Sequence, residues 1–272
     1  MIVQHNLTAM NSNRMLGITT GSQAKSTEKL SSGYKINRAA DDAAGLAISE
    51  KMRRQVRGLT QASANAQDGI SCVQTAEGAL AEVHDMLQRM NELAIKASND
   101  TMTSVDRGYI DAEVQQLKTE INRVQSTTTF NEQNLLTGEF KDKNLQVGAE
   151  AGQFISITID NMDCTTLGIG SVTVAGATNG DAQTAIGLVK DALAKVSKQR
   201  SDLGAVQNRL EHTIKNLDNV VENTTAAESA IRDTDMATEM VRYSNNNILA
   251  QAGTSMLAQA NQANQNVLSL LG

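Results

Sequence analysis

Three histidines, two cysteines and two acidic pairs are the residues of this chain whose side chains could bind a metal ion or act in catalysis. The histidines have no local metal-ligand spacing, and the cysteines form no Cys-x-x-Cys motif. The acidic pairs could chelate a cation. Helix capping, and solvation of the polar segment around residues 228–235, explain them more simply. These candidates are His5, His84, His212, Cys72, Cys164, Asp41-Asp42 and Asp233-x-Asp235.

Other chemistry has equally little support in the sequence. Gly168-x-Gly170 is too short for a phosphate-binding loop, and no Walker or dinucleotide motif occurs. Cys72 and Cys164 could form a disulfide, but two unlinked small residues are the simpler interpretation. We therefore expect no catalytic residues, no metal and no cofactor, and we predict that the protein is not an enzyme.

Composition favours long helices over a thick globular core. The 272 residues include no proline, no tryptophan, three Phe and three Tyr. Proline is the main helix breaker, so its absence permits long uninterrupted helices. The net charge of −6 argues against nucleic acid as the main partner. No run approaches the ~20 apolar residues of a membrane helix, so we expect no membrane partner.

Apolar residues recur every seven positions in two long segments, which predicts a coiled coil. The first series predicts a continuous helix over 46–98. A second helix follows the polar turn at 99–104, and the third begins near Ala182. Because the apolar seams need one another, we expect an antiparallel helical rod. The repeating residues are Met52, Leu59, Ala66, Val73, Leu80, Leu87 and Ala94, then Val189, Val196, Leu203, Leu210, Leu217, Thr224 and Ile231.

Between the second and third helices the apolar period changes to two. Alternation on both sides of the turn at 150–153 predicts one β-hairpin near 145–159. The stretch 130–140 reads as an irregular connection, and the glycine-rich stretch 168–181 reads as a loop. The predicted fold class is therefore mainly α, with one hairpin.

The two ends of the chain are uncharged yet keep helical spacing of apolar residues. Neutral amides coat the remaining positions of the last thirty residues, which suits burial among other polypeptides. A single helix buries only one apolar stripe, so we expect a terminal helical pair that becomes ordered on assembly. The stripe that we expect to mediate self-assembly comprises Val3, Leu7, Met10, Leu249, Met256, Ala260, Ala263, Val267 and Leu270.

Several independent segments resemble bacterial flagellin, the subunit of the flagellar filament. They read LSSGYKINRAADDAAGLAISEKM at 30–52, GLTQASANAQDGIS at 58–71, SDLGAVQNRLEHTIKNL at 201–217, AGTSMLAQANQ at 252–262 and NVLSLL at 266–271. The resemblance covers nearly the whole chain. Larger flagellins insert outer domains where this chain has only residues 168–181, so it resembles a short member without them.

The resemblance implies a domain organisation, a set of partners and a location. Residues 1–42 and 231–272 would form the two halves of an inner assembly domain, and residues 43–230 the helical rod with its hairpin. The chain would polymerise with itself, bind an export chaperone at its C-terminal segment, and meet the filament cap and hook-junction proteins. It would be extracellular, in the flagellum, and exported through the flagellar type III apparatus without a cleaved signal peptide.

A receptor contact also follows from the resemblance. The segment LQRMNELAIKA at 87–97 is similar to the flagellin segment sensed by the vertebrate flagellin-sensing Toll-like receptor, and Arg89, Leu93 and Glu113 occupy the matching positions. Arg89 and Leu93 are four residues apart, so we expect them on one helix face, off the seam of Leu87 and Met90. A solvated Arg and a Leu in a subunit contact are the simpler interpretation.

Two alternatives remain open from the sequence. A hook–filament junction protein of the same export system has similar ends but caps or adapts rather than polymerising indefinitely. A cytoplasmic coiled-coil scaffold would also carry heptads rich in Ala, Gln and Ser, but it would have ordered ends and form no fibres.

Overall fold

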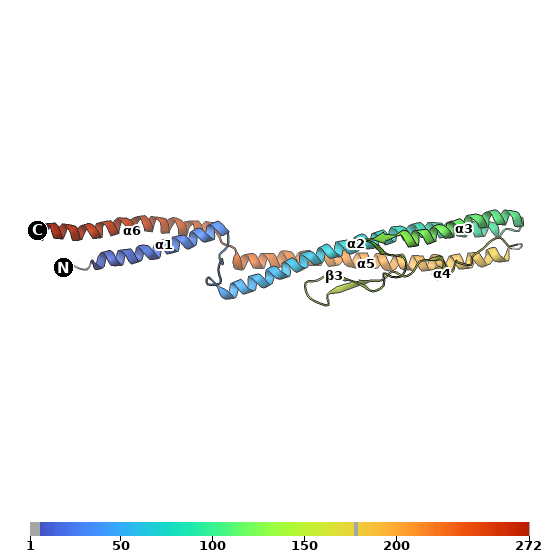
Figure 1. Ribbon diagram of the computed structural model, residues 1–272, viewed down its shortest axis with the longest axis horizontal. Coiled ribbons are helices and arrows are strands. Elements are labelled where there is room, and N and C mark those ends of the chain that lie inside the picture. The colour runs from blue at the N-terminus through green and yellow to red at the C-terminus, as the bar shows by residue number, and fades with distance from the viewer. Residues whose placement is uncertain (1–5, 177–178, 272) are drawn as a thin grey trace. The chain divides into compact units, whose positions relative to one another are not determined.

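The computed structural model describes residues 6–176 and 179–271, with side chains up to residue 263 (Figure 1). The chain divides into two compact units, a terminal unit of residues 1–56 and 222–272 and a central unit of residues 57–221. Two long helices, α2 (Ala43–Ala97) and α5 (Gly180–Arg232), each contribute to both units. They match the helices predicted from the heptads. The predicted domain boundaries at 42 and 231 concern the assembled protein and stay a prediction.

Helices α2, α5 and α3 (Ser104–Thr127) form the core of the central unit. Ser63 of α2 contacts Asp218 of α5, and Glu77 contacts Arg200, so α2 and α5 run in opposite directions. The predicted mainly α, antiparallel coiled coil is confirmed. The heptad residues buried in this unit are Leu59, Ala66, Val73, Leu80, Leu87, Ala94, Val189, Val196, Leu203, Leu210 and Leu217.

The turn between α2 and α3 is fixed by a capping box and a buried arginine. The Thr103 hydroxyl accepts a hydrogen bond from the Asp106 N–H, and the Asp106 carboxylate accepts one from the Thr103 N–H. The backbone N–H groups of Thr103 and Asp106 at the start of α3 thereby both have hydrogen-bond partners. Arg107 donates to the carbonyl oxygens of Ala97 at 3.0 Å and Asn99 at 3.4 Å. Its positive charge thus meets the carbonyl end of α2, where the helix dipole favours a cation.

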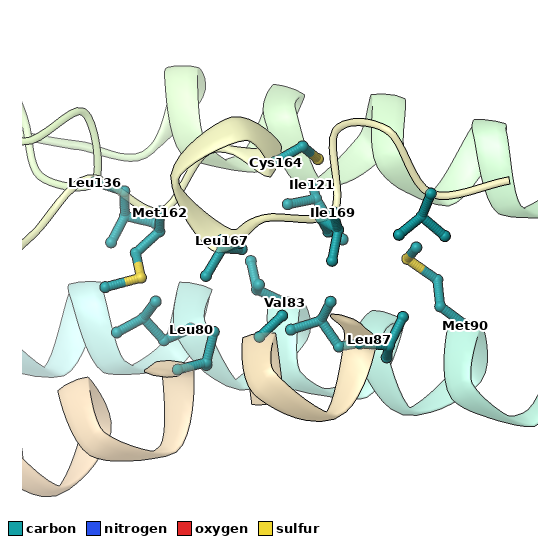
Figure 2. Close-up of a cluster of buried hydrophobic side chains, with 14 of the residues drawn as sticks. Leu80, Val83, Leu87, Met90, Ile121, Leu136, Met162, Cys164, Leu167 and Ile169 are labelled. Atoms are coloured by element: carbon teal, nitrogen blue, oxygen red, sulfur yellow. The ribbon is translucent and has the colours of Figure 1, made fainter. Parts of the chain in front are cut away.

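The segment that follows the predicted hairpin is part of the core. It contains a short helix, α4 (Cys164–Leu167), which runs between α3 and α2. Leu167 at the end of α4 and Ile169 in the loop after it point toward Leu80, Val83 and Leu87 (Figure 2). Most of 168–176 is irregular, as the glycines predict, but Ile169, Val172 and Val174 are buried. The Lys118 ammonium of α3 holds this segment by donating to the carbonyl oxygens of Gly170 at 2.7 Å and Val172 at 3.2 Å.

Two small antiparallel hairpins accompany the helices, where the sequence predicts one. The predicted hairpin pairs β3 (Lys143–Gln146) with β4 (Phe154–Ile157). A second hairpin pairs β1 (Thr129–Phe130) with β2 (Gln133–Asn134), so the expectation of an irregular stretch at 130–140 was wrong at its start. Its turn residues Asn131 and Glu132 have φ of 47° and 63°. Glutamate lacks the glycine signal that usually marks such a turn.

Candidate assembly and recognition surfaces

The two ends of the chain pair with each other inside the terminal unit. Helix α1 (Leu7–Ser32) lies beside α6 (Met236–Leu271) and runs in the opposite direction (Figure 1). The Asn6 amide donates to the Ala260 carbonyl oxygen at 3.0 Å, and the Asn246 amide donates to the Ser22 hydroxyl at 3.2 Å. These two neutral amides therefore bond to polar groups of the neighbouring helix.

A glycine allows α1 and α6 to approach closely. A Cβ at Gly253 would lie 3.2 Å from the Leu16 Cδ1 atom, which is tighter than ordinary contact. A groove of about 340 Å³ opens beside this contact and contains Met15 and Leu16 of α1 together with Leu249 and Met256 of α6. The pair of helices therefore leaves an apolar groove uncovered.

The predicted assembly residues are largely exposed in the single chain. The exposed fractions of Leu7, Met10, Leu249 and Met256 are 65%, 65%, 58% and 59%. Ala263 is exposed as well, and Ala260 is half-buried. Val3 lies outside the described residues, as do the side chains of Val267 and Leu270. Pairing of α1 with α6 thus covers only part of the apolar surface of either helix.

A network of contacts that the sequence did not reveal joins the α1–α2 loop and the first turns of α2 to the end of α5. The Arg232 guanidinium lies 4.6 Å from the centre of the Tyr34 ring and contacts Glu50 at 3.0 Å. Glu228 accepts a hydrogen bond from Ser49 at 2.8 Å and lies 3.7 Å from Arg53. No local pattern marks these residues, because they come from segments about 180 positions apart that meet only in the folded chain.

The residues carried over as a receptor site differ in accessibility. Arg89 of α2 and Glu113 of α3 are joined by an ion pair of 2.9 Å, with exposed side-chain fractions of 51% and 46%. The hydrogen bond that Arg89 donates to the Glu113 carboxylate raises the pKa of Arg89. Leu93, which we expected off the apolar seam, is only 3% exposed and belongs to the central core. The surface therefore presents Arg89 and Glu113, with Leu93 beneath it.

The acidic pairs considered as cation ligands serve turns and helix ends. Asp41 accepts hydrogen bonds from the backbone N–H groups of Arg38 and Asn37, which lower its pKa. Asp235 accepts hydrogen bonds from the hydroxyl and N–H of Thr238 at the start of α6, which lower its pKa too. Asp233 accepts one from Ser229. The contacts of Asp235 at the start of α6 agree with the capping interpretation, whereas Asp41 stabilises a turn.

The remaining candidates for chemistry are scattered or buried. His84 contacts Gln88, His212 is exposed, and His5 lies outside the described residues. Cys72 and Cys164 are free and buried, and burial raises the pKa of each thiol to about 11. Among the described residues, no group of three His, Cys, Asp or Glu could hold a metal ion. Within the same part of the chain, no helix is both long and apolar enough to span a membrane.

Comparisons with known proteins agree with the arrangement of the helices. Residues 3–141 match the family described as the bacterial flagellin N-terminal helical region, and residues 186–271 match the C-terminal helical region of the same family. The chain is 55% identical to a flagellin of Halalkalibacterium halodurans and 53% identical to the flagellar filament 31.3 kDa core protein of Treponema maltophilum, each over 100% of both chains. A crystal structure of Bacillus cereus flagellin, 28% identical, covers 57% of this chain and 88% of its own with a TM-score of 0.52.

Proposed function

This chain belongs to the bacterial flagellin family, and we propose that it polymerises through the apolar surfaces of its terminal unit. It is a structural subunit of the flagellar filament, where it assembles with other copies of itself. The proposal concerns which residues make the contacts between subunits. They are the expected stripe of α1 and α6, from Leu7 and Met10 to Leu249 and Met256, extended by Val3, Ala260, Ala263, Val267 and Leu270.

The single observation that carries this proposal is the exposure of large aliphatic side chains on both paired helices. Leu7, Met10, Leu249 and Met256 each keep more than half of their surface accessible. Full burial of one such side chain contributes about 1.5–3 kcal/mol. The rest of the α6 surface after Tyr243 carries no charge, so covering it removes no ionised group from water. Neighbouring copies of the same two helices supply a matching surface.

Replacing Leu249 with Asp tests this proposal. The expected result is at least about a tenfold loss in the rate at which monomers add to sheared filament seeds, because burying an unpaired carboxylate in an apolar contact costs several kcal/mol. Elongation is measured by light scattering and electron microscopy. Leu249→Met is the matched control and should elongate like the parent chain, since it conserves volume and polarity. Normal elongation by Leu249→Asp would contradict the proposed contact.

The same elongation assay separates a filament subunit from a hook–filament junction protein. A filament subunit adds to its own seeds until the monomer is exhausted, whereas a junction protein stops after a short adaptor layer. We expect fibres whose length grows with the monomer supplied. The full-length identity to a flagellin and to a filament core protein supports the first outcome.

We also propose that the ends contact other flagellar proteins before and during assembly. The part of α6 after Tyr243 carries no charge and exposes Leu249 and Met256, so it is a surface that an export chaperone could cover until the chain leaves the cell. The filament cap and the hook-junction proteins would meet the same terminal unit. The support is the exposed apolar stripe, which suits any partner that presents helices of similar character.

A second role is recognition of the monomer by the flagellin-sensing Toll-like receptor. We propose Arg89 and Glu113 as contact residues, with Leu93 supporting the surface from below. The observation in favour is that the ion pair holds two side chains from different helices on one accessible face.

Replacing Arg89 with Ala should weaken receptor signalling by the monomer about tenfold or more, because a central interface arginine commonly contributes over 1 kcal/mol. Helical content, measured by circular dichroism, should stay the same. Glu82→Ala, an exposed change about two turns earlier on α2, is the matched control and should leave signalling unchanged. Signalling by Arg89→Ala at the parent level would exclude the proposed contact.

A further inference from the structure

The most exposed and the most buried methionines lie in different units, while Met52, Met86 and Met102 are half-buried. Five methionines of the terminal unit are about half exposed or more: Met10 at 65%, Met15 at 52%, Met236 at 49%, Met240 at 57% and Met256 at 59%. In the central unit, Met90 and Met162 are buried at 1% and 4%. We call the first five the exposed methionines. They lie on α1 and α6, the two helices proposed to make the contacts between subunits.

Three of the exposed methionines, Met10, Met15 and Met256, are part of the proposed apolar assembly surface. Met15 and Met256 come from opposite helices and line the same groove, next to Leu16 and Leu249. Met10 and Met256 also belong to the stripe that the sequence predicts. Leucine has nearly the same volume and fills comparable positions at Leu7 and Leu249, so packing alone does not require a thioether. The thioether adds one property that leucine lacks, which is its reactivity toward oxidants.

Peroxide converts such a thioether into a sulfoxide in one balanced step. A sulfur lone pair attacks one peroxide oxygen, the S–O bond forms, the O–O bond breaks, and the departing oxygen leaves as water after proton transfer. Sulfur loses two electrons and the peroxide gains them. The product is a polar acceptor in place of an apolar side chain, and it disrupts contacts made by methionine.

We propose that the exposed methionines are a peroxide-sensitive modification site that controls whether a free subunit can join a filament. The inference rests on the proposed assembly role of the terminal unit. In the free subunit the five side chains are accessible and oxidise first. Their polar sulfoxides must then be buried in contacts that fit apolar thioethers, so addition to the filament slows. In the filament the neighbours cover them, and oxidation slows instead.

Footprinting with hydrogen peroxide tests the first half of the inference. Monomer and filament are treated with the same peroxide dose, and the sulfoxide fraction at each methionine is measured by peptide mass spectrometry. In the monomer, the exposed methionines should oxidise at least about tenfold faster than Met90 and Met162, in keeping with their accessibility. In the filament their rate should fall toward that of the buried pair. Equal rates in monomer and filament would overturn the inference.

Seeded elongation tests the second half. Oxidised monomer should add to untreated seeds at least about tenfold more slowly than untreated monomer, because burial of an unpaired polar group costs more than 1 kcal/mol. Treatment with two methionine sulfoxide reductases, one for each sulfoxide epimer, should restore the rate. The matched control replaces the five exposed methionines with leucine. It should elongate before and after peroxide at the same rate.

The outcomes separate this inference from the assembly proposal. Untreated monomer that fails to add to seeds would sink the assembly proposal and the inference with it. Oxidised monomer that elongates at the untreated rate would overturn only the methionine inference. Loss of elongation by the peroxide-treated leucine variant would assign the sensitivity to other residues and would overturn it as well.

Discussion

Deletion of residues 243–272 is expected to abolish addition to filament seeds while leaving the central unit folded. The deletion removes most of α6, and with it the Ala260 carbonyl that pairs with Asn6 and the Asn246 amide that pairs with Ser22. It also removes the exposed Leu249 and Met256. Helix α1 then loses its partner in the same chain, and the subunit loses six of the nine residues of its proposed contact surface. Elongation should fall below detection by light scattering.

The central unit supplies the control for this deletion. Its core is built from α2, α3, α5 and the segment around α4, none of which the deletion reaches. Hydrogen exchange should therefore show unchanged protection of buried positions such as Leu80 and Leu203. Fibres formed by the shortened chain would contradict the proposal that the terminal unit drives assembly. Loss of protection across 57–221 would instead show that the deletion damages the fold.

Replacing Leu93 with Ala should destabilise the central unit by about 2–5 kcal/mol, the usual range for truncating a buried leucine. Leu93 is 3% exposed and belongs to the same cluster as Met90, Ala97 and Val114. The change leaves a cavity between helices that already carry Arg89 and Glu113. Urea titration of the whole chain, with hydrogen exchange read out over residues 80–97, measures the loss.

Ile95→Ala is the matched control for this substitution. Ile95 lies two residues further along α2 and is 55% exposed, so its truncation should change the free energy of unfolding by no more than about 0.5 kcal/mol. If Leu93→Ala were as stable as Ile95→Ala, the proposed supporting role of Leu93 would be wrong. Comparison of these two variants also guides the interpretation of receptor-signalling data. A weaker signal from Leu93→Ala would include the effect of destabilising the surface that carries Arg89 and Glu113.

Regular repetition made the helical part of the fold predictable. Each heptad of α2 and α5 spans two helical turns, and its repeating residue lies in the apolar seam. Val73, Leu87 and Leu203 are all buried as expected. Alternation predicted the β3–β4 hairpin, and the uncharged ends predicted that α1 and α6 would present apolar surface. Each of these signals is local in sequence, so a single chain is enough to detect it.

Features that depend on contacts between distant segments could not be predicted in the same way. The network of Tyr34 with Arg232 and of Ser49 with Glu228 has no local signature. The burial of Leu93 depends on which helix packs over that face of α2, and heptad spacing alone placed it off the seam. Glycines made 168–181 look like a surface loop, although Ile169 and Val174 complete the core.

The sequestered thiols have a practical consequence for observing this protein. Cys72 and Cys164 both have a pKa of about 11, so at neutral pH almost no thiolate is present to react with a maleimide dye. Ser171 lies on the exposed part of the segment after α4, and Ser171→Cys exchanges one oxygen for sulfur. A fluorophore attached there would mark each molecule at one known position, with both native cysteines left in place.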